Sequence, residues 1–345
     1  MRQAAQPEVP GEAEKVAFLA RAESYAHRPA AVEVVETHMS WVFLAGPRVF
    51  KMKKPVRTRF LDFVTLERRR QAVADELRLN RRLARGVYLG ARALRLRPGG
   101  GLTLGDEGEV VDWLIEMRRL PEERELKDLV EAGRAGPADV DAVAGMLVAF
   151  YQSQPAAATT PERYAERYAR EHRETAKVLT DPAFGMDGES VAAALSEFEA
   201  AHEAARPLLE ARVRAGRIVE GHGDLRPEHV FLTEPPVAID CLEFNEGLRT
   251  VDPFDEIAFL GLECARHGAD WVYPELRDRL EAGLDDRPEP ALLAFYWRYR
   301  ALLRTRLALL HLSTPGVKHP AKWRPLAERY LGFAAEAEAR AVAPA

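Results

Sequence analysis

The order in which strand-like and helix-like segments follow one another constrains the fold of this chain most strongly. Segments that are short and rich in β-branched or aromatic residues fill the first third, with a single helical segment among them at residues 65–85. The predicted strands cover residues 32–36, 41–46, 48–55, 91–96, 101–105 and 110–118. Strands collected in one part of the chain and helices in the other predict an α+β fold, not alternating β-α units.

Most of the chain after Pro121 is predicted to be helical. Thr160 and Pro161 form a strong helix start, because threonine caps a helix and proline suits its first turn. The predicted helices cover residues 161–178, 190–215, 254–266, 289–312 and 320–341, and a further short helix is expected at 11–25. One predicted hairpin, at residues 218–244, interrupts them. The expected organisation is an N-terminal helical extension at 1–32, a sheet-containing lobe at 33–117 and a helical lobe at 118–345.

Charge and cysteine content exclude several classes of protein. The 345 residues carry 49 Lys and Arg against 54 Asp and Glu, and a net charge of −5 argues against a protein that holds nucleic acid by charge alone. Cys241 and Cys264 are too few for a disulfide framework and lack zinc-finger spacing. No signal-peptide pattern and no apolar run of membrane-spanning length occur in the sequence, so we expect a cytoplasmic protein without a membrane partner.

The lysines are unevenly distributed. Only eight of the 49 basic residues are lysine, yet Lys51, Lys53 and Lys54 fall within four positions. On a predicted strand, Lys51 and Lys53 face one side of the sheet while Phe50 and Met52 face the other. This cluster marks one sheet face as a place where compact positive charges are needed.

The densest group of polar side chains in an apolar setting is His222-Gly223-Asp224-Leu225-Arg226-Pro227-Glu228-His229. Asp240 follows eleven residues after His229, directly behind the apolar run Val237–Ile239. A short hairpin between them would bring Asp224, His229 and Asp240 together. Two acids and one neutral ligand suit Mg²⁺ in a phosphate site, because this ion leaves its other positions to phosphate and water.

This octapeptide resembles the catalytic loop of the protein-kinase-like fold, H-R-D-L-K-P-E-N, and its aminoglycoside phosphotransferase form H-G-D-L-H-x-x-N. The resemblance implies a bilobal fold with an antiparallel sheet plus helix in the nucleotide-binding N-lobe and a mostly helical C-lobe carrying the loop at 221–244. It implies that Asp224 is the catalytic base, that Arg226 lies near the transferred phosphoryl group, and that Asp240 holds the metal. The cofactors it implies are ATP and Mg²⁺.

The sequence departs from this pattern at two places. His229 stands where the family has a metal-binding Asn, and neither Phe nor Gly follows Asp240. Because Mg²⁺ prefers oxygen ligands, His229 indicates either Mn²⁺, a rearranged Mg²⁺ or weakened metal binding.

The upstream half supplies the other groups that the resemblance requires. Lys51 is predicted to contact the α- and β-phosphates and to pair with Glu76 on the following helix, with Lys53 as the alternative. No G-x-G-x-x-G precedes them, and Ser40 in the turn at 37–40 is a candidate phosphate contact. Glu116 and Met117 would lead into the backbone that binds adenine.

The resulting prediction is an ATP-dependent phosphotransferase that moves the γ-phosphoryl group to a hydroxyl of a small molecule. The alternative is a catalytically inactive kinase-like module that binds nucleotide or a partner. A metallophosphatase would need further metal-ligand blocks, and a P-loop kinase would need G-x-x-x-x-G-K-[ST], neither of which occurs. The run at 36–41, the 51–55 block and residues 240–245 resemble an uncharacterised bacterial branch of the family, whose members are sometimes fused to a P-loop ATPase.

The acceptor and the oligomeric state stay open at this point. The predicted helices at 161–178 and 190–215 occupy the region where related kinases build their acceptor site. Three acidic residues there, Glu162, Glu166 and Glu171, would suit a cationic acceptor, but a solvated helix face has the same composition.

Overall fold

The structure is a computed structural model that describes residues 9–58, 61–313, 316–317 and 319–344. The chain divides into two units, the first formed by Met1–Glu122 with Val237–Glu246 and the second by Glu123–Pro236 with Gly247–Ala345. The boundary at Pro236 and Val237 falls inside the segment predicted as a hairpin. Residues 1–8 of the predicted N-terminal extension lie outside the described part of the chain.

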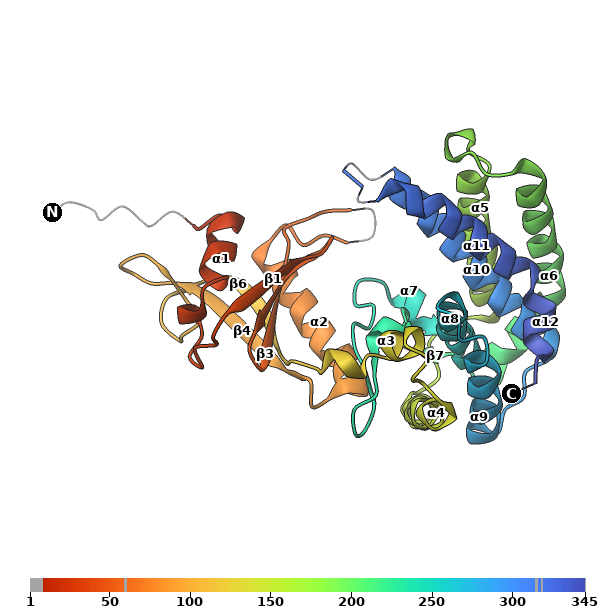
Figure 1. Cartoon of the computed structure of the whole chain (residues 1–345), viewed down its shortest axis with the longest axis horizontal. Coiled ribbons are helices and arrows are strands. Elements are labelled where there is room, and N and C mark those ends of the chain that lie inside the picture. The colour runs from red at the N-terminus through yellow and green to blue at the C-terminus, as the bar shows by residue number, and fades with distance from the viewer. Residues whose placement is uncertain (1–8, 59–60, 314–315, 318, 345) are drawn as a thin grey trace. The chain divides into compact units, whose positions relative to one another are not determined.

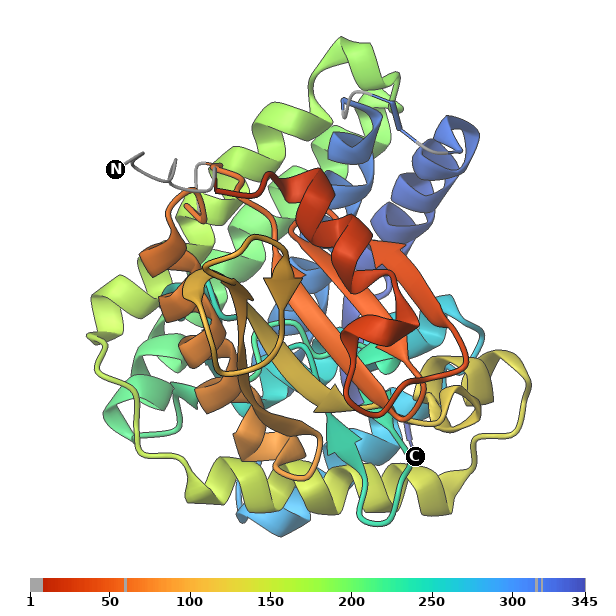
Figure 2. The same cartoon turned by 90° about the vertical axis from the view of Figure 1, so that its left-hand side faces the viewer.

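The first unit is built on one antiparallel sheet (Figures 1 and 2). Its six strands lie in the order β1-β2-β3-β6-β4-β5, and every neighbouring pair is antiparallel. The strands are β1 (Val32–Glu36), β2 (Ser40–Ala45), β3 (Arg48–Lys53), β4 (Tyr88–Leu96), β5 (Leu102–Thr103) and β6 (Glu109–Arg118). The central position of β3 and β6 lets both of their faces be covered by helices.

The two faces of β3 carry different chemistry. Phe50 and Met52 are buried in an apolar cluster. The cluster includes Leu19, the last residue of helix α1 (Glu12–Leu19), and Tyr25 from the segment after it. On the opposite face, Lys51 and Lys53 meet helix α2 (Leu66–Ala84). Strand alternation therefore puts the apolar pair under α1 and the lysine pair under α2, as the sequence predicted.

The second unit is mostly helical. Its longest helices, α5, α6 and α10, pack against one another, and α10 also packs along α11 (Figure 1). The helices are α3 (Leu126–Glu131), α4 (Pro137–Ser153), α5 (Pro161–Leu179), α6 (Gly188–Arg214), α7 (Glu246–Arg249), α8 (Pro253–Arg266), α9 (Val272–Leu284), α10 (Pro290–Leu312), α11 (Trp323–Ala335) and α12 (Ala337–Val342). The short strands are β7 (Val219–Glu220), β8 (Val230–Phe231) and β10 (Thr250–Val251), while β9 (Val237–Ala238) belongs to the first unit.

Helix α8 is the buried centre of the second unit. Asp252 caps it by accepting the N–H of Phe254 at 3.0 Å and forms a two-point ion pair with Arg212, at 2.6 and 3.0 Å. Asp255, one turn later, accepts from Arg300 at 2.6 and 2.9 Å. These acids therefore anchor α8 in the core and are structural residues.

The α+β class and the division into a sheet-containing part and a helical part are confirmed. Thr65 and Thr160 cap α2 and α5 by accepting the N–H groups of Arg68 and Arg163. Two helix predictions were too long, because the first ends at Leu19 and the segment at 320–341 is divided between α11 and α12. In the described part of the chain, no helix combines the length and apolar character that a membrane crossing requires.

The first unit contains a buried cluster of three charges whose loss we expect to destabilise it. Asp112 on β6 accepts from Lys15 of α1 at 2.8 Å and from Arg69 of α2 at 2.7 and 3.1 Å, and all three residues are buried. Asp112→Asn would leave two buried cations with one uncharged partner. We expect its free energy of unfolding to fall by about 3 kcal/mol.

The matched control is Glu67→Gln, which removes an exposed carboxylate that pairs with Arg70 on the same helix. We expect that substitution to leave the free energy of unfolding nearly unchanged, because exposed ion pairs contribute little to stability. Urea denaturation followed by circular dichroism measures both values, and equal losses in the two variants would contradict a stabilising role for Asp112.

Candidate functional site

Five charged side chains of the first unit form a continuous series, which we call the charge ladder: Asp240, Lys51, Glu76, Lys53 and Glu243. The ammonium of Lys51 lies 2.6 Å from Asp240 Oδ1 and 2.9 Å from Glu76 Oε1. The ammonium of Lys53 lies 2.5 Å from Glu76 Oε2 and also pairs with Glu243. Each oxygen of Glu76 therefore serves one lysine, and each lysine reaches one acid of the segment after β9.

The members of the charge ladder differ in how far their side chains are exposed to solvent. Glu76 is fully buried and the side chain of Lys53 is 2% exposed, whereas that of Asp240 is 47% exposed. Burial raises the pKa of Glu76, but Lys51 and Lys53 outweigh burial and hold this pKa below its ordinary value. The ladder thus begins in the core as a fixed ion pair and ends at an accessible carboxylate.

The segment carrying Asp240 is held by its backbone. Asp240 has a left-handed conformation with φ of 60°, and its N–H donates to the hydroxyl of Tyr88 at 3.1 Å. The N–H of Cys241 donates to Asn80 Oδ1 at 2.9 Å, and Asn80 in turn donates to the carbonyl of Glu76. Helix α2 and strand β4 therefore fix the position of Asp240 independently of its own side chain.

Ser40, Glu116 and Met117 lie in less open surroundings than a ligand contact requires. The hydroxyl of Ser40 is enclosed without a hydrogen-bond partner in the described part of the structure, and its N–H donates to Thr37 Oγ1 at 3.0 Å. Glu116 and Met117 are in register with residues of both β3 and β4. A ligand contact from the Ser40 hydroxyl would require the turn at 37–40 to rearrange. The backbone of Glu116 and Met117 is already paired within the sheet.

The second unit holds Asp224, Arg226 and His229 together in one loop. Arg226 Nη2 donates to Asp224 Oδ2 at 3.1 Å, and its Nη1 donates to Glu228 Oε1 at 2.5 Å. The side chains of Asp224 and Arg226 are 29% and 22% exposed, whereas that of His229 is 9% exposed. The loop therefore presents a carboxylate and a guanidinium to solvent above a nearly buried imidazole.

Hydrogen bonding determines which ring nitrogen of His229 carries the proton. His229 Nδ1 lies 2.7 Å from the carbonyl oxygen of Asp224, which can only accept, so Nδ1 must donate. His229 Nε2 lies 3.1 Å from Arg226 Nη2, which can only donate, so Nε2 must accept. The neutral imidazole thus directs a lone pair at Nε2 toward Arg226, and this is also the nitrogen through which it would bind a metal.

Close packing on α8 fixes the start of this loop. A Cβ added at Gly221 would lie 2.4 Å from Val251 and 2.6 Å from Glu256, so only glycine fits there. Glu256 accepts the N–H of Gly223 and the hydroxyl of Tyr151, the latter at 2.8 Å. Burial raises the pKa of Glu256 above its ordinary value. These contacts hold the backbone from which Asp224 projects.

Each unit, taken by itself, offers one side chain that could serve as a metal ligand beside phosphate. In the described ranges, no group of three or more His, Cys, Asp or Glu side chains is arranged to hold a metal alone. Asp240 offers a half-exposed carboxylate, and His229 offers a lone pair once Arg226 moves away from it. Few protein ligands are what Mg²⁺ uses beside phosphates, whereas Mn²⁺ accepts imidazole more readily.

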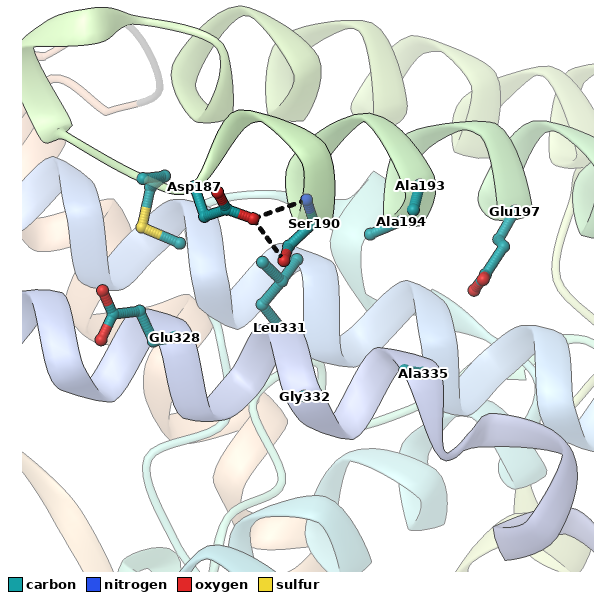
Figure 3. Close-up of a pocket in the computed structure, with 10 residues that line it drawn as sticks. Asp187, Ser190, Ala193, Ala194, Glu197, Glu328, Leu331, Gly332 and Ala335 are labelled. Carbon is teal, nitrogen blue, oxygen red and sulfur yellow. Dashed lines mark hydrogen bonds between the residues drawn. The ribbon is translucent and has the colours of Figure 1, made fainter.

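The acids expected near an acceptor are mostly paired with basic side chains. Glu171 of α5 accepts from Arg306 at 2.7 Å, and Glu166 pairs with Arg173 at 3.2 Å. A cavity of about 420 Å³ lies between α6 and α11 (Figure 3). Three acids line this cavity: Asp187, which bonds to Ser190, Glu197, which lies 3.7 Å from Arg298, and Glu328, which pairs with Arg324. No basic side chain is among the described residues that line it, so the cavity is acidic.

Four residues of the site were missed by sequence reasoning: Glu243, Tyr88, Asn80 and Glu256. Glu243 lies three residues after Asp240, and Asn80 lies one helical turn after Glu76, so their spacing was available as a signal. Tyr88 and Glu256 had no local signal, because their partners are 152 and 33 residues distant in sequence.

Comparison with known proteins finds relatives of similar sequence and solved structures of similar fold. No family model matches the chain. Uncharacterized proteins of Mycobacterium tuberculosis and Mycobacterium bovis are 33% identical over 296 residues, which cover 82% of this chain and 55% of theirs. The chain thus spans about half the length of these curated relatives.

Two solved structures share the fold. A choline/ethanolamine kinase family protein from Mesorhizobium loti superposes with a TM-score of 0.52 at 16% identity, covering 96% of both chains. A choline kinase from Cryptosporidium parvum superposes with a TM-score of 0.54 at 13% identity, covering 96% of this chain and 98% of that one. At such low identity the likeness establishes the fold.

The two lysines of the charge ladder should differ in their effect on stability. Lys53→Met leaves the nearly buried carboxylate of Glu243 without its lysine, and we expect the free energy of unfolding to fall by about 3 kcal/mol. Lys51→Met leaves Glu76 paired with Lys53 and leaves the half-exposed Asp240 to solvent. We expect a loss of about 1 kcal/mol for Lys51→Met. Denaturant titration distinguishes the two, and a larger loss for Lys51→Met would contradict this description of the ladder.

Proposed function

We propose that the chain, whose fold is shared by two solved kinase structures, belongs to the protein-kinase-like superfamily and is an ATP-dependent phosphotransferase acting on a hydroxyl of a small molecule. The proposal rests on the contacts of Lys51 with two acids. Its ammonium lies 2.9 Å from buried Glu76 and 2.6 Å from accessible Asp240. A lysine held in this way can exchange its bond to Asp240 for one to a phosphate while Glu76 keeps it in place.

In this proposal the first unit binds the nucleotide. Lys51 contacts the α- and β-phosphates, and Lys53 holds Glu76 and Glu243 in position behind it. Asp240 holds Mg²⁺ or Mn²⁺, which would neutralise charge on the phosphates and orient them. Glu116 and Met117 lead into the backbone that receives adenine, and the turn containing Ser40 covers the phosphates.

The second unit provides the groups for transfer. Asp224 accepts the proton of the acceptor hydroxyl while the oxygen of that hydroxyl forms a bond to the γ-phosphorus. The bond between that phosphorus and the β,γ-bridging oxygen breaks, and ADP leaves. Arg226 lies 3.1 Å from Asp224, so its guanidinium is close enough to offset charge on the transferred phosphoryl oxygens.

In the second unit, His229 is proposed to bind metal through Nε2. Its Nδ1 donates to the carbonyl of Asp224, which orients the ring and keeps the lone pair on Nε2. Release of Arg226 from this lone pair would free the guanidinium for the phosphoryl group at the same time. Metal binding and positioning of Arg226 would then be coupled.

The extents of the lobes and the acceptor are part of the same proposal. The nucleotide-binding lobe corresponds to residues 33–117 and the helical lobe to 118–345, with the catalytic loop at 221–244, in a cytoplasmic protein that binds neither nucleic acid nor membrane. The solved structures of similar fold are those of a choline/ethanolamine kinase family protein and a choline kinase, so amino alcohols belong among the hydroxyl compounds to be tested.

The second candidate function is a kinase-like module that binds nucleotide without transferring phosphate. Its support is the bond between Arg226 and His229 at 3.1 Å, which occupies both the proposed metal ligand and the proposed phosphoryl contact. The two candidates share nucleotide binding and differ only in turnover.

Asp224→Asn separates the two candidates. The amide cannot accept the hydroxyl proton, so we expect phosphate transfer to fall by about a hundredfold to ten-thousandfold. ATP affinity should stay within about twofold, because the proposed nucleotide contacts lie on the first unit. Lys51→Met should instead weaken ATP binding. Calorimetry with Mg²⁺ or Mn²⁺ measures affinity, and ADP release with a panel of hydroxyl compounds measures transfer.

Asp141→Asn serves as the control, since this exposed acid on α4 pairs with the half-buried Arg279 and lies outside the proposed catalytic loop. Transfer in Asp224→Asn equal to that in Asp141→Asn would exclude Asp224 as the base. Metal-dependent ATP binding without any ADP release by the unaltered chain would favour the inactive module.

A further inference from the structure

The carboxylate of Asp240, the proposed metal ligand of the first unit, is covered by a cation of the same unit. The ammonium of Lys51 lies 2.6 Å from Asp240 Oδ1. A lysine carries a full positive charge at neutral pH, because its pKa lies far above neutrality. A divalent cation that approaches Asp240 therefore meets a like charge beside the oxygen that it has to bind, and like charges at such short range repel strongly.

The backbone of Asp240 is held in place, so this residue cannot withdraw from Lys51. Its N–H donates to the hydroxyl of Tyr88 at 3.1 Å, and the next N–H, that of Cys241, donates to Asn80 Oδ1 at 2.9 Å. The side chain of Asp240 is 47% exposed, so ions from solvent can reach it. Its two oxygens belong to one carboxylate, and a metal at either of them is close to the ammonium. Metal binding at Asp240 therefore requires Lys51 to move.

Lys51 can leave Asp240 without leaving its place on the strand. Its ammonium also lies 2.9 Å from Oε1 of the fully buried Glu76, so one ion pair remains when the other breaks. Lys53 cannot take its place at Asp240, because its side chain is 2% exposed and pairs with Glu76 and Glu243. Release from Asp240 leaves Lys51 with one acid in place of two, and a phosphate oxygen restores the second partner. An anion therefore favours the release that a free metal ion does not.

We propose that Lys51 closes Asp240 to free divalent cations and that a phosphate of the nucleotide opens it. The inference rests on the proposed function and concerns the order in which its ligands bind. Phosphate draws the ammonium away from Asp240, and the uncovered carboxylate can then hold a metal that the phosphates also bind. Nucleotide and metal bind cooperatively, with the nucleotide first, and the metal alone has little affinity for the first unit.

The test measures Mn²⁺ binding to the full chain without nucleotide, by electron paramagnetic resonance of the free ion. Lys51→Met removes the ammonium from Asp240 and leaves Glu76 paired with Lys53. The matched control is Lys54→Met, which removes the same charge from the residue directly after β3, where the ammonium lies 2.5 Å from Oε1 of the exposed Glu36. Neither ATP binding nor turnover enters this measurement.

We expect Lys51→Met to bind Mn²⁺ at least about tenfold more tightly than the unaltered chain, which is the effect of removing one charge-assisted hydrogen bond from the carboxylate. Lys54→Met should bind Mn²⁺ as the unaltered chain does. Adding Asp240→Asn to Lys51→Met should remove the gain. Circular dichroism checks that each variant is folded, and Lys51→Leu repeats the comparison with a second uncharged side chain.

Three results would overturn the closure of Asp240 by Lys51: no gain in folded Lys51→Met and Lys51→Leu, an equal gain in Lys54→Met, or a gain that survives Asp240→Asn. Calorimetry of the unaltered chain tests the order, and we expect ATP to bind in metal-free buffer. Binding of ATP only after metal is added would overturn the order. A gain in Mn²⁺ affinity without phosphate transfer by the unaltered chain supports the closure and contradicts the proposed function, whereas transfer without the gain does the reverse.

Discussion

The chemistry proposed for the first unit depends on the ion pairs that the buried carboxylate of Glu76 forms with Lys51 and Lys53. A fully buried carboxylate is tolerated only when it is paired and hydrogen-bonded. Here Lys51 and Lys53 each take one of its oxygens, and this arrangement fixes the register of β3 against α2. Because both lysines also reach acids after β9, the pairing of Glu76 also determines where Asp240 and Glu243 lie.

In the second unit, backbone contacts rather than buried ion pairs hold the candidate site residues in position. Its reactive loop is held by backbone contacts, with Gly221 packed against Glu256 and the carbonyl of Asp224 bonded to His229. The side chains of Asp224 and Arg226 therefore project from a fixed backbone while keeping partial exposure. Rigid support beneath accessible charge is what proton transfer and phosphoryl binding require. His229 adds a link, because its ring joins the loop backbone at Asp224 to the guanidinium of Arg226.

Much of the fold could be predicted from sequence, because the strands are short and rich in β-branched or aromatic residues and threonines cap α2 and α5. The pairing of Lys51 with Glu76 was also predictable, since strand alternation and the position of Glu76 on α2 define facing surfaces. The choice between Lys51 and Lys53 was not, because both face α2 and only the distances show that Lys51 reaches Asp240 while Lys53 reaches Glu243.

Other features depended on contacts between distant residues. The role of Glu256 requires α8 to pack beneath Gly223, and the tautomer of His229 follows from the positions of a carbonyl and a guanidinium. In these cases residue type was visible in the sequence, but its chemical partner was not.

The central claim is that this chain transfers phosphate from ATP to a hydroxyl. Its most direct test is mass spectrometry of a panel of hydroxylated metabolites, including amino alcohols and amino sugars, after incubation with the purified chain, ATP and Mg²⁺ or Mn²⁺. The account predicts one compound heavier by a single phosphoryl group, formed in equal amount with ADP. ADP formed by hydrolysis alone, with no phosphorylated compound over the whole panel under either metal, would contradict it.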